Sequence, residues 1–111
     1  MDIRIQELPQ QVTRIVLDGR LDSTGAVEIE LPFNAAVTAK RAILADLTSV
    51  TFLSSFGVRL LLVGAKVCAA KGGKFVVLSP AGPVTKVLRI ARFDALAPVV
   101  DSEEAALAAL A

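Results

Sequence analysis

The sequence predicts a single α/β domain over residues 1–111, with a mixed, mostly parallel sheet of four to five strands flanked by about four helices. The main observation is segment 41–78, whose pattern predicts a strand, a loop over 48–52, a helix, a Gly-Gly turn and a second strand. Its two strands, 42–47 and 75–78, are nearly continuous apolar runs, as expected for parallel strands covered on both faces. An apolar content of 54% in 111 residues suits one domain with a sizeable core.

A β-hairpin is expected before this unit. Residues 2–6 and 12–17 alternate polar and apolar side chains, which is typical of half-buried strands. Asp18-Gly19 then predicts a turn. We therefore expect the first two strands to form a hairpin at the edge of the sheet.

The segment 23–40 fits two patterns. Positions 27, 29 and 31 are apolar and alternate as in a strand, whereas positions 27, 31 and 35 have helical spacing. We interpret the segment as a helix, because two parallel strands need a crossover connection. Asp22 precedes it and is a suitable N-cap.

Two more helices and a short strand are expected after the central unit. Residues 80–83 contain two prolines that interrupt the chain, and positions 84–91 then have the spacing of an amphipathic helix. Residues 98–100 predict a final short strand. Either Asp101 or Ser102 is expected to cap an Ala-rich closing helix.

The central helix, residues 55–71, is apolar on two sides. The side expected to face the sheet carries Val58, Leu61, Leu62, Ala65, Cys68 and Ala69. The opposite side, bordered by Arg59 and Lys66, carries Leu60, Val63, Val67 and Ala70. Either another helix of the domain covers this opposite side, or it binds a partner. Phe56 favours a partner-binding surface, since it lies in the first turn and outside the sheet-facing stripe.

The composition argues against catalysis. There is no His, so a His-based triad, a general base that titrates near neutrality and a His zinc site are all excluded. The glycines form neither GxxxxGK[ST] nor GxGxxG. We expect no catalytic residue, no metal and no cofactor.

The balance of charged residues bears on the kind of partner. The net charge is +1, with 12 Lys and Arg against 11 Asp and Glu, and no segment is strongly basic. This argues against a nucleic-acid partner.

No apolar run approaches the roughly 20 residues of a membrane-spanning helix, and the first residues do not have the pattern of a secretory signal. A single Cys fits a reducing compartment. We expect a soluble, cytoplasmic protein without direct membrane insertion.

Ser54 and Ser55 stand where the central helix begins. One of the two is expected to be the N-cap. A phosphoryl group on a serine here would lie beside free backbone N–H groups and the positive end of the helix dipole. Capping and regulation by phosphorylation are compatible.

The segment DLTSVTFLSSFGVRLLL, residues 46–62, resembles the signature of STAS domains, specifically of the bacterial anti-sigma factor antagonists. In that signature, a strand ending D-[LF]-S-x-V leads to F-[IM]-D-S-[ST]-G-[LIV]. The matching positions are Asp46, Val50, Phe52, Ser55, Gly57 and Val58. Gly19-Arg20-Leu21-Asp22 likewise resembles the family's G-x-[LI]-D, and Leu78-Ser79-Pro80 resembles the segment after its next strand. The resemblance covers nearly the whole chain and implies the STAS-type fold.

This resemblance implies a function in partner switching. The unphosphorylated antagonist binds an anti-sigma factor, a serine kinase of the histidine-kinase-like ATPase superfamily, and so frees the sigma factor. The kinase phosphorylates the serine that aligns with Ser55, and a phosphatase reverses the reaction; Ser54 is the less favoured site. Asp22 and Asp46 are expected near this serine. Two positions depart from the signature: Ser54 replaces an Asp, and Phe56 replaces a Ser or Thr.

The resemblance and the apolar outer side of the helix together predict the partner-binding residues. These are Asp22, Leu53, Ser54, Ser55, Phe56, Gly57, Arg59, Leu60 and Val63. One alternative is a non-phosphorylated STAS scaffold subunit of a signalling or transporter-associated assembly, held by Leu60, Val63 and Val67. A second alternative is binding of a small ligand in the crevice at the strand ends.

Overall fold

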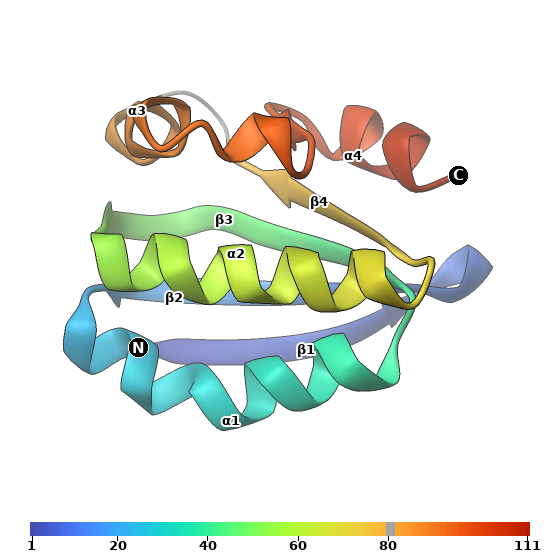
Figure 1. Ribbon diagram of the computed structural model, residues 1–111, viewed down its shortest axis with the longest axis horizontal. Coiled ribbons are helices and arrows are strands. Elements are labelled where there is room, and N and C mark those ends of the chain that lie inside the picture. The colour runs from blue at the N-terminus through green and yellow to red at the C-terminus, as the bar shows by residue number, and fades with distance from the viewer. Residues whose placement is uncertain (80–81) are drawn as a thin grey trace.

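The structure is a computed structural model that describes residues 1–79 and 82–111. Five strands form one sheet in the order β1-β2-β3-β4-β5, and four helices pack against it (Figure 1). The strands are β1 (Asp2–Leu8), β2 (Val12–Leu21), β3 (Ala42–Leu53), β4 (Lys74–Leu78) and β5 (Val99–Val100). The helices are α1 (Ser23–Ala39), α2 (Ser55–Ala70), α3 (Pro83–Ile90) and α4 (Glu103–Leu110). Short 3₁₀ turns lie at Pro9–Gln11 and Phe93–Ala95.

The strand directions confirm the predicted mixed sheet. β1 pairs antiparallel with β2 at one edge, and β2, β3, β4 and β5 run parallel to their neighbours. The hairpin, the βαβ unit and the short last strand are all where the sequence pattern placed them. The α/β fold class with a mostly parallel sheet is therefore confirmed.

Two predicted interruptions are wrong. Residues 48–52 are not a loop, because β3 continues to Leu53, and Asp18-Gly19 is not a turn, because β2 continues to Leu21. The two extensions pair with each other, with Asp18 opposite Ser49 and Leu21 opposite Leu53. Irregularities in the register around Asp18 and Gly19 accommodate these residues, and Gly19 has a φ of 118°.

The segment after Asp22 is helical, as the crossover argument predicted. Asp22 caps α1 by accepting a hydrogen bond from the Gly25 N–H at 2.8 Å. The buried apolar side of α1 consists of Ala26, Ile29, Phe33, Ala36 and Val37. Val27 and Leu31, which fitted both the strand and the helix pattern, point outward and are 73% and 83% exposed.

The ends of the other helices resolve the remaining predictions. Gly72 has a φ of 75°, and the Gly73 N–H donates to the Cys68 carbonyl at 2.8 Å, so the Gly-Gly pair closes α2 as predicted. Pro83 begins α3, whereas Pro80 and Ala81, the start of the predicted interruption, lie outside the described residues. Ser102, and not Asp101, caps α4 by accepting from the Ala105 N–H at 3.1 Å.

The two faces of the sheet have separate cores. Residues of α1, α2 and α3 share one core with every second residue of the central strands, including Ile43, Ala45 and Phe75. The other core lies under α4 and contains Leu44, Val76, Leu78, Ala106 and Leu110, together with Val12. Cys68 is fully buried in the first core, and burial raises the pKa of its thiol. Among the described residues, no helix has the length and apolar content needed to cross a membrane.

Candidate functional site

The candidate site lies where β2 and β3 end side by side and the helices α1 and α2 begin. Leu21 and Leu53 are paired at the ends of these strands, and the Ser54 N–H donates to the Leu21 carbonyl at 3.0 Å. Asp22 and Ser54 follow directly and are the N-caps of α1 and α2. The structure thus brings the predicted Asp22 and the serine pair to one end of the molecule.

The two serines have different environments. The Ser54 hydroxyl accepts from the Gly57 N–H at 3.4 Å and donates to the Leu21 carbonyl at 3.0 Å. Ser55 takes the first helical position, is exposed, and makes no side-chain hydrogen bond among the described residues. Capping therefore occupies Ser54 and leaves the hydroxyl of Ser55 free.

Three residues predicted to bind a partner are buried instead. Leu53 is 4% exposed and Leu60 is 7% exposed, and Gly57 is also buried. A Cβ on Gly57 would lie 2.6 Å from the Leu21 side chain and 2.7 Å from that of Leu53, so this glycine lets α2 pack closely on the strand ends. Leu60 turns toward α1. Of the two alternatives for the outer side of the central helix, burial under another helix of the domain is therefore correct for Leu60. These three residues position the site and do not form its surface.

The other predicted residues of α2 form an exposed surface. Phe56 is 59% exposed, Val63 is 43% exposed, and Ser55 and Arg59 are exposed as well. Phe56 and Val63 belong to a groove between α1 and α2, which we call the α1–α2 groove. Its lining residues are Ser23, Ala26, Val27, Glu30, Asn34, Phe56, Arg59, Leu60 and Val63. The partly apolar wall that α1 contributes was not predicted, because the sequence did not show which side of α1 would face outward.

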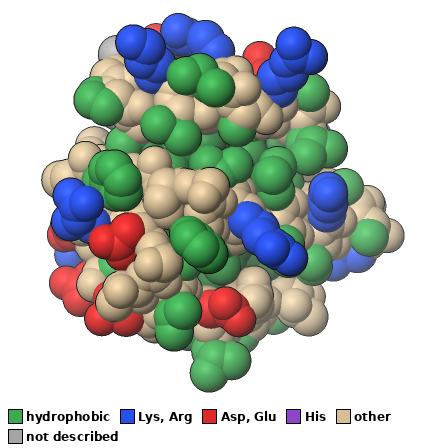
Figure 2. Space-filling model, turned by 60° about the vertical axis from the view of Figure 1, so that its left-hand side comes forward, with side chains coloured by type: hydrophobic (Ala, Val, Ile, Leu, Met, Phe, Trp, Pro, Cys, Tyr) green, Lys and Arg blue, Asp and Glu red, His purple; other side chains and the backbone are tan. Residues whose placement is uncertain are grey.

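A second groove, the α2–α3 groove, lies on the other side of α2. It is lined by Ser55, Val58, Arg59, Leu62, Val87, Ile90 and Ala91, and is almost entirely apolar. Figure 2 shows hydrophobic side chains gathered between the upper part of the molecule, which carries α3, and the middle, which carries α2. Ile90 is 75% exposed. Sequence reasoning missed this groove, although an apolar Ile90 between basic residues of an amphipathic helix was an available signal.

Asp22 lies beside a cationic and aromatic pair. The N–H of Gly25 holds the pKa of Asp22 below its usual value, and Arg20 contributes in the same direction. Arg20 Nε is 3.6 Å from the Asp22 carboxylate, and its guanidinium lies 4.3 Å from the ring centre of Phe52. Phe52 is 41% exposed. Arg20 and Phe52 are therefore further surface residues near the serine pair that the sequence analysis did not select.

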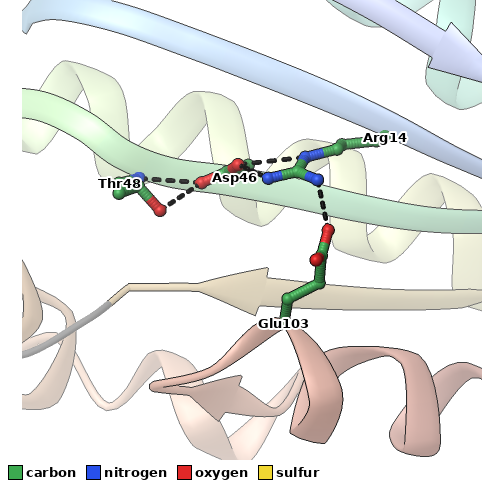
Figure 3. A network of polar contacts seen from close by, with 4 residues as sticks. All are labelled: Arg14, Asp46, Thr48 and Glu103. Carbon is green, nitrogen blue, oxygen red and sulfur yellow. Dashed lines mark hydrogen bonds and ion pairs between the residues drawn. The ribbon is translucent and has the colours of Figure 1, made fainter.

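Asp46 was expected near the serine pair, but the structure does not place it there. Its side chain lies on the face of the sheet that α4 covers, together with Arg14 and Glu103 (Figure 3). It is 3% exposed and accepts hydrogen bonds from Arg14 Nε at 3.0 Å and from the Thr48 N–H at 2.9 Å. Arg14 also pairs with Glu103 of α4. Along β3, Asp46 has the orientation of Leu44, which belongs to the core under α4, whereas α2 covers the other face.

The pKa of Asp46 reflects this environment. Burial acts to raise it, but the hydrogen bonds from Thr48 and the hydrogen bonds and charge of Arg14 outweigh burial and leave the pKa below its ordinary value. The carboxylate is thus ionised and linked to β2 and α4. Asp46 is a structural residue that joins three elements. Within the part of the chain that the structure describes, no group of three His, Cys, Asp or Glu residues could hold a metal ion.

This combination of a mixed sheet, a hairpin edge and a capped serine pair at the start of α2 has the form of a STAS domain. The chain belongs to the STAS domain family, whose match covers residues 4–106. A Bordetella bronchiseptica protein named as an anti-sigma factor antagonist, BtrV, is 33% identical over 94 residues, which are 84% of this chain and 81% of that protein. The suspected resemblance is thereby confirmed.

Solved structures agree with this assignment. An anti-sigma-factor antagonist (STAS) domain protein from Planctomyces limnophilus has a TM-score of 0.85 and 30% identity, over 98% of this chain and 97% of that chain. The Bacillus protein SpoIIAA in its phosphorylated form has a TM-score of 0.72 and 22% identity, over 96% and 97% of the two chains, and shows likeness of fold. By homology and fold, the chain is a member of the anti-sigma factor antagonist family.

Proposed function

We propose that this protein is a cytoplasmic anti-sigma factor antagonist that binds its anti-sigma factor when Ser55 is unmodified and releases it when Ser55 is phosphorylated. The observation that carries the proposal is the free hydroxyl of Ser55, exposed at the start of α2 and lining an apolar groove, while Ser54 serves as the N-cap. The relatives named as anti-sigma factor antagonists support the choice of partner. We assign the protein no catalytic role.

The partner in this proposal is a serine kinase of the histidine-kinase-like ATPase superfamily, and a phosphatase restores the unmodified form. Residues around Ser55 form the contact: the half-buried Asp22 and the exposed Phe56, Arg59 and Val63, with the α2–α3 groove beside them. Phe56 replaces a hydroxyl residue of the family signature and adds exposed aromatic surface. An aromatic side chain of this kind is a typical anchor of a protein interface.

The physical basis of the switch is desolvation. A phosphoryl group adds about −1.5 to −2 charges at pH 7. Burying this charge against Val58, Val87 and Ile90 costs several kcal/mol, because even a phosphate that is paired with a cation of the groove must lose its hydration. A micromolar complex has a binding free energy of about −8 kcal/mol, so a penalty of this size is enough to dissociate it.

The test combines phosphorylation with binding. The protein is incubated with candidate kinases and ATP, and intact mass is measured for wild type, Ser55→Ala and Ser54→Ala. We expect one phosphoryl group on wild type and on Ser54→Ala, and none on Ser55→Ala. Modification of Ser55→Ala to the wild-type extent would contradict the assignment of the site.

Binding is measured by pull-down of the partner with wild type, Ser55→Asp and Ala108→Asp. Ala108 is an exposed residue of α4, so this matched control adds the same charge on the opposite face. We expect Ser55→Asp to lose the complex and Ala108→Asp to retain it. A complex that withstands Ser55→Asp would reject the switch and favour the scaffold function.

A further inference from the structure

We propose that the guanidinium of Arg59 forms an ion pair with the phosphoryl group carried by phosphorylated Ser55, and that phosphorylation thereby withdraws the Arg59 cation from the α1–α2 groove. This inference rests on the proposed phosphorylation of Ser55 and adds the means by which the chain itself responds. Arg59 lines both grooves, so its guanidinium can serve either side of α2.

The spacing of the two residues on α2 suits an ion pair. Ser55 and Arg59 are four residues apart within one helix, and both line the α2–α3 groove. Side chains at this spacing are neighbours, with Cβ atoms about 5–6 Å apart, and the favourable order places the anion N-terminal to the cation. A phosphoserine at position 55 and Arg59 meet both conditions.

The chemistry of the groove leaves the phosphate few other partners. Among the described residues that line it, Arg59 is the charged one, and the wall contributed by α3 consists of Val87, Ile90 and Ala91. Arg59 itself is exposed and takes part in no ion pair within the described part of the chain. A guanidinium offers paired N–H donors that match phosphate oxygens, which makes Arg59 a suitable receptor.

The consequence extends to the other groove. In the unmodified protein, Arg59 is one of the residues that line the α1–α2 groove, together with Phe56 of α2 and Glu30 of α1. There it offers a cation to an acidic group of a bound partner. When Arg59 pairs with phosphoserine, that cation is neutralised, so one modification adds an anion to the α2–α3 groove and removes a cation from the α1–α2 groove.

The test installs phosphoserine at position 55 by genetic code expansion, so no kinase is needed. The second pKa of the phosphate is measured by ³¹P NMR titration in four proteins: wild type, Arg59→Gln, Arg59→Lys and Lys66→Gln. Lys66 is a matched control, because it is an exposed cation of α2 that lies outside both grooves. Amide spectra of the variants verify that each is folded.

We expect Arg59→Gln to raise the phosphate pKa by about 0.3 units, since an ion pair at this spacing favours the dianion. Arg59→Lys should retain most of the effect of the wild type, and Lys66→Gln should match wild type. A second readout is the Arg59 Nε–H resonance, which should shift on phosphorylation. Equal pKa values in wild type and Arg59→Gln, or equal shifts for Arg59→Gln and Lys66→Gln, would overturn the proposal.

The result is separable from the fate of the proposed function. If Arg59→Gln raises the phosphate pKa but phosphorylation leaves partner binding unchanged, the ion pair is supported and the proposed switch is rejected. If phosphorylation abolishes partner binding while Arg59→Gln leaves the phosphate pKa unchanged, the switch is supported and the ion pair is rejected.

Discussion

Ser54 and Ser55 are adjacent, yet the backbone gives their hydroxyls opposite functions. Ser54 has an extended conformation, with φ of −97° and ψ of 174°, which turns its side chain back over the first turn toward the Gly57 N–H. Ser55 is already helical, and its side chain points outward to solvent. A helix that begins with two serines can therefore use one for stability and keep the other free for modification.

This difference predicts the outcome of two alanine substitutions. Ser54→Ala removes the N-cap and the hydrogen bond to the Leu21 carbonyl, and should lower the free energy of unfolding by about 1 kcal/mol. Ser55→Ala should change it by less than about 0.5 kcal/mol, because the hydroxyl is exposed. Urea unfolding followed by circular dichroism checks both, and equal losses would show that the capping assignment is wrong.

The ionised Asp46 predicts a pH dependence of stability. Its folded pKa lies below the ordinary value of 3.8, so the stabilisation it provides is complete above about pH 4 and is lost as the pH falls through the folded pKa. Asp46→Asn should therefore be less stable than wild type at pH 6, and the difference should narrow toward pH 3. Urea unfolding at a series of pH values measures this, and a difference that stays constant down to pH 3 would contradict the prediction.

At the scale of elements, α4 is the helix that covers the second face of the sheet. Ala106 is fully buried against strand residues that include Leu44 and Val76, whereas Ala108, two residues away, is exposed. The pairing of Arg14 with both Asp46 and Glu103 ties the same helix to β2 and β3 (Figure 3). The docking of α4 thus depends on two buried residues, Ala106 and Leu110, and on one ion-pair network.

A matched pair of substitutions tests this docking. Ala106→Glu would bury a charge without a partner and should destabilise the protein by at least about 3 kcal/mol, or separate α4 from the sheet. Ala108→Glu adds the same side chain at an exposed position and should cost less than about 0.5 kcal/mol. Urea unfolding gives both values, and hydrogen exchange in α4 detects local separation. Similar stabilities of the two variants would refute the packing of α4.

Periodicity was sufficient for the type of most elements, whereas the helix α1 was predicted from the need for a crossover connection. The apolar runs of β3 and β4 and the helical spacing of α3 were interpreted correctly, because burial against one sheet imposes those patterns, and the capping residue and Ala-rich composition predicted α4. The ends of β2 and β3 were not predictable. Asp18-Gly19 and Thr48-Ser49 are turn-like residues, and only their pairing across the two strands keeps them in the sheet.

The site was predicted in part for a related reason. The exposure of Phe56 follows from its position outside the sheet-facing stripe of α2, which the helical spacing of the sequence shows. The burial of Leu60 depends on where α1 lies against α2, and the orientation of Asp46 depends on the register of β3. Both the burial of Leu60 and the orientation of Asp46 are determined by contacts between elements that are distant in the chain. No local sequence pattern could therefore reveal them.

At the scale of the whole molecule, the candidate site lies on rigid elements at one end of the sheet. The strand ends Leu21 and Leu53 are buried and paired, and both flanking helices are capped at their first residues. The site residues that are exposed, Ser55, Phe56 and Arg59, project from this framework without forming part of either core. A modification of Ser55 can therefore change the surface while the interior stays the same.

This separation of surface and interior predicts that phosphorylation leaves the fold unchanged. Protein carrying phosphoserine at position 55 should unfold with a free energy within about 0.5 kcal/mol of the unmodified protein, because no packed or hydrogen-bonded group is displaced. Amide shift changes in ¹H–¹⁵N spectra should be confined to the first turns of α2, the facing part of α3 and the α1–α2 groove. Shift changes spread through β4 and α4, or a large loss of stability, would mean that the phosphate acts by rearranging the fold. Shift changes confined to these surfaces and an unchanged stability, together with loss of the partner, would locate the switch entirely at the interface.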